Sequence, residues 1–94
     1  MKKGFAFEVT SEMIHEMHLT GSSLLVFAYL DAFSRDGGYY VHGIENIGKM
    51  LGLSRYTVYN AVRSLQINNL IEVSNFLGSQ GKTYKRIRTI TERR

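Results

Sequence analysis

The sequence predicts a single α+β domain in which three helices pack beside a small antiparallel sheet. Three observations predict it: an apolar helical segment at 21–34, two shorter helical segments joined by a glycine turn at 44–62, and two strand-like segments around a glycine-rich stretch near the C-terminus. The 94 residues suffice for one hydrophobic core. We expect an N-terminal extension (1–18), a three-helix core (19–68) and a hairpin (70–90).

The N-terminal extension is expected to hold one strand and one short helix. In "FAFEV", residues 5–9, apolar and other residues alternate, which is typical of a half-buried strand. "SEMIHEM" follows Thr10, a good N-cap residue, and Glu12 in the first turn favours a helix start.

The first core helix is predicted over 21–34, with Thr20 as its N-cap and "RDGG" after its end. Its apolar residues cover about 200° of arc, which is more than one core-facing stripe needs. Either this helix is sandwiched inside the domain, or part of it contacts a second subunit.

The segment "IENIGKMLGLSRYTVYNAV", residues 44–62, has the spacing of a helix-turn-helix. Gly48 gives the small residue needed where two helices approach closely, and Gly52 gives a positive φ in the turn. Apolar residues clamp the two helices together: Ile44, Ile47, Leu51, Leu53, Val58 and Val62.

Further residues set the ends of these elements. Residues 39–41, "YYV", are a short strand candidate, and Gly43 precedes the helix predicted over 44–51. Ser54 is the expected N-cap of the helix over 55–68. Asn69 is expected to end that helix at positive φ, where asparagine is the best substitute for glycine.

The segments "LIEVSNF" and "TYKRIRTI" are expected to pair as a hairpin in which Val73 faces Ile87. This register also pairs Glu72 with Arg88, Phe76 with Tyr84 and Gly78 with Lys82. The connection is then residues 79–81, with Gly81 at the left-handed position. Pairing Val73 with Arg86 instead would place arginines in the core, so that register is rejected.

The charge is unevenly distributed along the chain, whose formal net charge is +4. Residues 1–53 carry four basic and six acidic groups, which gives −2, whereas residues 54–94 carry eight basic and two acidic groups, which gives +6. This asymmetry indicates a polyanionic partner for the C-terminal half.

Together, "LTGSSLLVFAYLDAF" and "IENIGKMLGLSRYTVYNAVRSLQINNLIEV" resemble a winged helix-turn-helix DNA-binding domain, in particular the N-terminal domains of plasmid and phage replication initiators and replisome organisers. The chain departs from that pattern where His42 and Gly43 replace Pro-Ser and where Asn69 replaces glycine. The resemblance implies binding of double-stranded DNA in replication initiation, with the hairpin as the wing. A transcriptional regulator and a module that docks an acidic protein are the alternatives.

The resemblance also implies which side chains meet the duplex. On the helix over 55–68, the side chains expected to read bases in the major groove are Arg55, Tyr56, Tyr59, Asn60 and Arg63. Those expected to hold the phosphate backbone are Ser54, Thr57, Lys82, Lys85 and Arg86. A homodimer on a two-fold related site is expected, with residues 5–33 as the interface.

Other classes of function find no support in the sequence. "GSQGKT", residues 78–83, ends like a phosphate-binding loop, but Phe76 stands where that motif needs its first glycine. The chain has no cysteine, and His15 and His18 are three residues apart, whereas the zinc protease motif needs four. We therefore expect no enzyme activity, metal or cofactor. The longest apolar run, Leu24–Leu30, is too short for a membrane span, and Glu8 interrupts any signal peptide, so a cytoplasmic protein is expected.

Overall fold

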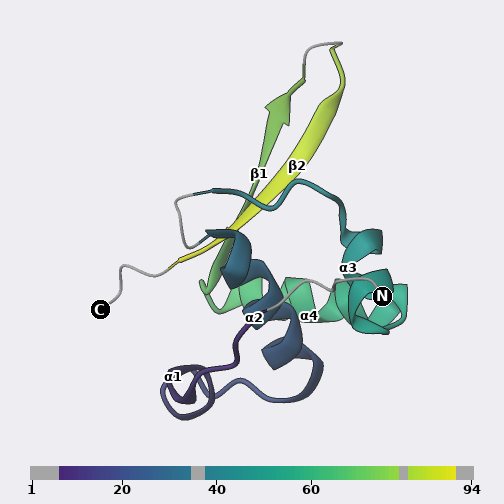
Figure 1. Ribbon diagram of the computed structural model, residues 1–94. Helices are drawn as coiled ribbons and strands as arrows, with labels where there is room; N and C mark the ends of the chain where they lie inside the picture. The colour runs from purple at the N-terminus through teal and green to yellow at the C-terminus, as the bar shows by residue number, and fades with distance from the viewer. Residues whose placement is uncertain (1–6, 35–37, 79–80, 91–94) are drawn as a thin grey trace.

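The computed structural model describes residues 7–34, 38–78 and 81–90 (Figure 1). Within them the chain forms four helices and a two-stranded antiparallel sheet, which confirms the α+β prediction. The elements are α1 (Ser11–His15), α2 (Gly21–Ser34), α3 (Ile44–Leu51), α4 (Arg55–Ile67), β1 (Ile71–Leu77) and β2 (Thr83–Thr89). None of the helices in these ranges has the length and apolar character that a membrane crossing requires.

The extension differs in part from its prediction. The helix is present, and the Thr10 hydroxyl accepts a hydrogen bond from the Met13 amide at 3.3 Å, as an N-cap should. The strand predicted at 5–9 is wrong for residues 7–9, which lie in no strand, while Phe5 and Ala6 lie outside the described residues. Phe7 packs edge-on against Tyr29, with ring centroids 5.8 Å apart, so its apolar side chain is accommodated by the core without a neighbouring strand.

α2 is enclosed by the rest of the chain. Five consecutive residues, Val26–Leu30, are each at most 3% exposed, so the helix is buried on more than one side. It packs against α4 and the lower part of β2, and it also touches α1 and α3. Burial inside the domain accounts for most of its wide apolar arc, while Leu25, 36% exposed, remains at the surface.

The turn between α3 and α4 depends on a close backbone approach at Gly48. A methyl group on Gly48 would lie 2.6 Å from the carbonyl oxygen of Leu53 and 3.5 Å from Cγ2 of Val58. Gly52 has φ +72°, and its amide donates to the carbonyl of Gly48, which ends α3 as predicted. The helix-turn-helix prediction is confirmed.

The start of α3 and the end of α4 lie close to where the sequence predicts them, with one difference in how α3 is capped. Gly43 occupies the N-cap position of α3 at φ +92°, but it has no side chain to cap the helix. The Tyr40 hydroxyl instead donates to the Gly43 carbonyl at 2.8 Å, which ties the approach to α3 to the core. Asn69 has φ +60° directly after α4, as predicted for a residue in the place of a glycine.

The two strands pair in the predicted register, with Val73 opposite Ile87. Ile87 and Thr89 are buried, so the base of the hairpin is part of the core. Beyond the last strand pair, the Gly78 amide donates to the Lys82 carbonyl at 2.7 Å, and Gly81 has φ +81°. The other two residues of the predicted connection, Ser79 and Gln80, lie outside the described residues.

The other edge of β2 is closed near its base by isolated contacts. Tyr40 and Ile87 exchange two backbone hydrogen bonds, so the strand predicted at 39–41 is reduced to a single bridge. Further along, the Ser34 hydroxyl accepts from the Thr89 amide at 3.0 Å, and the Thr89 hydroxyl donates to Asp31 at 2.8 Å. These contacts anchor the hairpin to α2.

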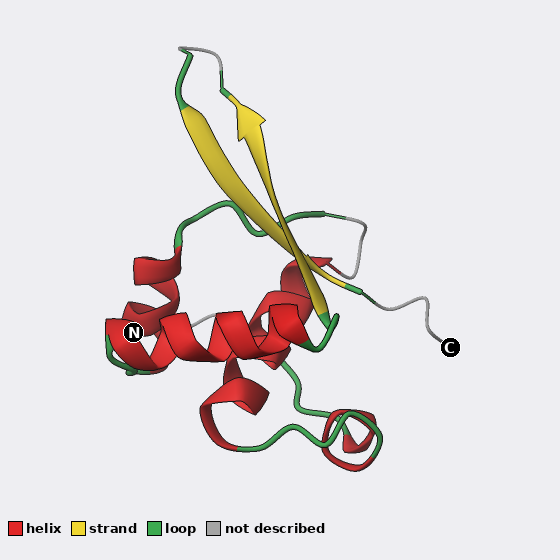
Figure 2. Cartoon of the chain, turned by 180° about the vertical axis from the view of Figure 1, so that it is seen from behind, coloured by secondary structure: helices red, strands yellow, loops and turns green. Residues whose placement is uncertain are grey.

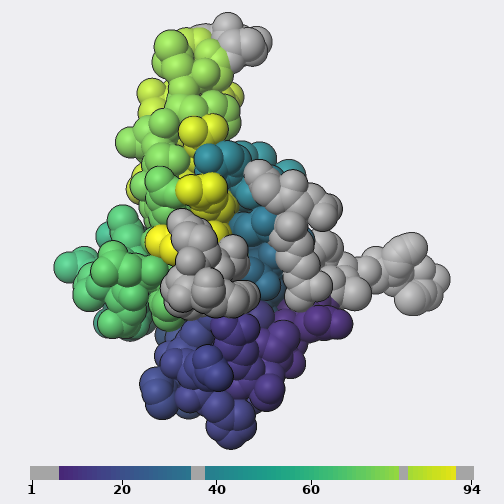
Figure 3. Space-filling view, turned by 90° about the vertical axis from the view of Figure 1, so that its left-hand side faces the viewer, coloured from purple at the N-terminus to yellow at the C-terminus, as the bar shows by residue number. Residues whose placement is uncertain are grey.

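The upper part of the hairpin extends away from the helices. Seen from behind, β1 and β2 rise from the end of α4 and cross above the helical layer (Figure 2). In the space-filling view the hairpin stands at one end of the molecule and α1 at the opposite end (Figure 3). The hairpin thus has two accessible faces, one on the side of α4 and one on the other side.

Gly48→Ala is expected to lower the free energy of unfolding by about 1–3 kcal/mol, although alanine favours helix more than glycine does. The cause is the added methyl group, which would force the Leu53 carbonyl to move. Ser64→Ala, at an exposed position of α4, is the matched control and should stay within about 0.5 kcal/mol of the parent. Urea denaturation measures both, and a Gly48→Ala chain as stable as the control would contradict the close approach.

Candidate nucleic-acid interface

α4 presents a buried face and an open face. Val58, Ala61, Val62 and Leu65 are at most 5% exposed and pack into the core. On the opposite side lie the five residues that the sequence assigned to base reading, all of them exposed: Arg55, Tyr56, Tyr59, Asn60 and Arg63. Tyr56 is 76% and Tyr59 is 52% exposed, which is unusual for tyrosine and leaves both rings available for contact.

The start of α4 is fixed by two of the residues assigned to the phosphate backbone. The Ser54 hydroxyl accepts from the Thr57 amide at 3.1 Å, and it donates to the Thr57 hydroxyl at 2.9 Å. Both side chains are therefore held at the helix N-terminus, where the helix dipole favours an anion. The Thr57 oxygen accepts in this pair, and a hydroxyl that accepts can still donate its own proton.

Arg55 forms an ion pair that the sequence does not predict. Its guanidinium binds the carboxylate of Glu45 in the first turn of α3. Both side chains are more than 60% exposed, so solvent screens the pair and it contributes little to stability. Another anion could therefore replace Glu45 on Arg55 at small cost.

A groove runs between α4 and the hairpin, with a volume of about 300 Å³. It is lined by Ile44, Tyr59, Val62, Arg63, Gln66, Ile67, Val73 and Lys85. The structure thus brings two predicted α4 residues, Tyr59 and Arg63, together with the predicted hairpin residue Lys85. The groove joins a basic rim to an apolar floor.

The other two hairpin residues assigned to phosphate lie elsewhere. Lys82 is exposed at the far end of the hairpin, beyond the groove. Arg86 lies on the opposite face from Lys85, because successive residues of a strand point to opposite faces. Its guanidinium donates to the Ser74 hydroxyl at 3.2 Å and sits 4.2 Å from the centre of the Tyr39 ring. The structure therefore does not bring Arg86 together with α4.

Three side chains of this region are not among the site residues predicted from the sequence: Glu45, Gln66 and Ile67. Ile67, 68% exposed, follows Arg63 by four residues and continues the row of Arg55, Tyr59 and Arg63. Gln66 lies beside it, so helical spacing could have found both. Nothing in the spacing indicates Glu45, since its approach to Arg55 depends on the turn between the helices.

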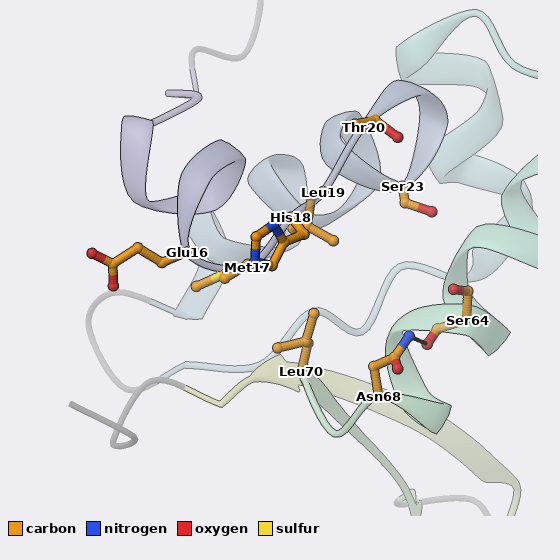
Figure 4. A pocket seen from close by; sticks show the side chains of 9 residues that line it. All are labelled: Glu16, Met17, His18, Leu19, Thr20, Ser23, Ser64, Asn68 and Leu70. Atoms are coloured by element: carbon orange, nitrogen blue, oxygen red, sulfur yellow. Dashed lines mark hydrogen bonds between the residues drawn. The ribbon is translucent and has the colours of Figure 1, made fainter.

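A second pocket, of about 570 Å³, lies beside the C-terminal end of α4, where other residues of the helix line it (Figure 4). It is lined by Glu16, Met17, His18, Leu19, Thr20, Ser23, Ser64, Asn68 and Leu70. The Asn68 amide donates to the Ser64 carbonyl at 2.9 Å, and the Glu16 carboxylate points away from the other side chains. Besides Glu16 and the His18 imidazole, this pocket is lined by hydroxyl, amide and apolar groups, and it contains no arginine or lysine.

Burial raises the pKa of Tyr40 and of Tyr29, two core residues whose ring centroids are 5.8 Å apart. Among the described residues, no three His, Cys, Asp or Glu side chains cluster closely enough to hold a metal ion.

Three core helices with a helix-turn-helix and a C-terminal hairpin make this chain a winged helix, with β1 and β2 as the wing. Two solved structures share the architecture. A possible transcriptional regulator from Methanosarcina mazei Go1 matches with a TM-score of 0.60 and 17% identity, over 87% of this chain and 65% of that chain. S. aureus MepR, in a complex with DNA, matches with a TM-score of 0.57 and 26% identity, over 85% of this chain and 54% of that chain.

These matches cover less than two thirds of either neighbour's length, and they establish the winged-helix fold. Neither neighbour is described as a replication protein, so the expected likeness to replication initiators is not supported. No protein-family model matches the chain. No curated protein matches it by sequence.

Proposed function

We propose that this chain binds double-stranded DNA through α4 and the wing, as a transcriptional regulator. The observation that carries the proposal is the groove in which the open face of α4, with Tyr59 and Arg63, meets Lys85 of the wing. A major groove accepts an α-helix, and a basic strand beside it can then approach the adjacent phosphates.

Charge and fold neighbours support the same proposal. Residues 54–94, which contain α4 and the wing, carry a formal charge of +6, which suits a polyanion. One fold neighbour is described as a possible transcriptional regulator, and the other was solved bound to DNA. These descriptions favour regulation over the role in replication initiation that the sequence resemblance implied.

In this proposal the residues have distinct roles. Arg63 and Asn60 project from α4 toward base edges, where arginine recognises guanine and asparagine recognises adenine. Arg55 exchanges Glu45 for a phosphate or a base as the duplex approaches. Ser54 and Thr57 hold a phosphate at the N-terminus of α4, and Lys85 holds one across the groove.

Arg55→Gln with Arg63→Gln is expected to weaken binding to a specific duplex by at least about tenfold, because each good arginine–guanine pair contributes about 1–3 kcal/mol. The control, Asn68→Asp with Asn69→Asp, lowers the net charge by the same amount at two exposed positions after the end of α4, outside both the predicted duplex contacts and residues 5–33. Fluorescence anisotropy measures affinity, and circular dichroism checks the fold. Equal losses in both chains would mean that overall charge alone drives binding, and no loss in the arginine variant would favour docking to an acidic protein.

Lys85 and Arg86 provide a second test, because they are adjacent in sequence and lie on opposite faces of the wing. If about five phosphates are neutralised per subunit, the logarithm of duplex affinity should fall with the logarithm of salt concentration at a slope of about −4 to −5 for each bound subunit. Lys85→Gln should make this slope shallower by about 0.9, whereas Arg86→Gln should leave it unchanged. The reverse result would place the duplex on the other face of the wing.

We also propose that the regulator acts as a homodimer, with residues 5–33 as the interface. Within the described part of that range, the exposed large apolar side chains are Val9, Ile14 and Leu25. Ile14→Lys with Leu25→Lys should therefore convert a dimer to a monomer in sedimentation velocity, while Met50→Lys, an equally exposed apolar site on α3, should not. A parent chain that sediments as a monomer would refute the dimer.

A further inference from the structure

The wing has a second face that the proposed duplex interface does not use, and we call it the stacking face. It is the side of β1 and β2 turned away from the groove, together with Tyr39 of the segment that crosses beside β2 (Figure 1). Its side chains are Tyr39, Glu72, Ser74, Phe76, Tyr84, Arg86 and Arg88. Three of the seven are aromatic and two carry guanidinium groups.

The flat groups of this face lie side by side. The Arg86 guanidinium lies 4.2 Å from the centre of the Tyr39 ring and 5.6 Å from that of Phe76. Phe76 and Tyr84, directly paired across the strands, have ring centroids 5.6 Å apart and planes inclined by 32°. A row of planar groups therefore runs from Tyr39 through Arg86 and Phe76 to Tyr84.

The Tyr84 ring is held in place by a glycine. A methyl group on Gly78 would overlap this ring, so the ring lies directly over the Gly78 backbone. Even so, 44% of Tyr84 is exposed, and its side chain also lines a cavity of about 560 Å³ between β2 and residues 40–45. A ring that is already held in place loses little conformational freedom when a second ring stacks on it.

The guanidinium groups of this face are also held in place by hydrogen bonds. Arg86 donates to the Ser74 hydroxyl, and Arg88 donates to the Glu72 carboxylate at 2.8 Å. In the bond that Arg86 makes with Ser74 only its Nε–H donates, so its terminal N–H groups can still meet a phosphate. Positive charge beside an exposed aromatic ring suits an unpaired nucleotide, which brings both a phosphate and a base.

We propose that the stacking face binds single-stranded nucleic acid, with an unpaired base stacked on Tyr84 and its phosphates near Arg86. This activity goes beyond duplex binding, and it can be tested separately because Tyr84 does not line the groove between α4 and the wing. Stacking on an aromatic side chain tolerates any base, so binding should show little sequence preference. The site would let the wing hold a strand that is unpaired beside the duplex.

Substitutions at Tyr84 test this proposal. Tyr84→Leu keeps an apolar side chain over Gly78 but removes the ring, and Tyr84→Phe keeps the ring. The probe is a labelled oligothymidylate, which cannot pair with itself, followed by fluorescence anisotropy. Tyr84→Leu should weaken binding by about fivefold or more, the loss of one stacked base, while Tyr84→Phe should bind like the parent. Equal affinity of the leucine and phenylalanine variants would overturn the proposal.

Parallel measurements separate this site from the proposed duplex interface. Tyr84→Leu should leave affinity for a labelled duplex unchanged, and Arg55→Gln with Arg63→Gln should leave affinity for oligothymidylate unchanged. If Tyr84→Leu alters the thermal unfolding midpoint, Phe76→Leu is used in its place, because Phe76 is the neighbouring ring. This variant should likewise weaken binding of oligothymidylate and leave duplex affinity unchanged. A polyglutamate peptide tests whether this face binds any polyanion. If the peptide binds as tightly as oligothymidylate, and if Tyr84→Leu changes neither affinity, the face is a general polyanion surface and stacking is refuted.

Discussion

The burial of α2 is the constraint on which the rest of the fold depends. Its residues Val26–Leu30 contribute nearly all of their surface to the core, and no other element touches as many neighbours. α4 lies along it, and β2 is fixed to it through Ser34, Asp31 and Thr89. Since α4 and the wing are both packed on the same helix, the groove between them has a defined width.

The wing shows how one short strand can present two different chemistries. Residues at alternate positions of β2 face either the groove or the opposite side, so Lys85 and Arg86 serve different surfaces although they are neighbours in sequence. At the base, the same alternation places Ile87 and Thr89 in the core. Beyond the base the hairpin extends away from the helices (Figure 1), and side chains of both faces, among them Lys85 and Tyr84, are exposed.

Much of the fold could be predicted because local chemistry and global packing agree. Asn69 adopts the positive φ expected of it, Ser54 caps α4, and Val73 pairs with Ile87. Each of these follows from a residue type and a short spacing. The strand predicted near Phe7 is wrong for residues 7–9 because alternation shows only which side chains seek burial. It does not show whether a sheet edge is available to pair with them.

By itself the sequence determined the helices, the turn at Gly48 and Gly52, the register of the wing and which face of α4 is polar, because helical and strand periods and glycine conformations are local properties. The tertiary structure alone decided what those polar residues meet. It placed Glu45 on Arg55, set Lys85 opposite Arg63 and stacked Arg86 between Tyr39 and Phe76. Such contacts join residues far apart in the chain, and their distances follow only from how the elements pack around α2.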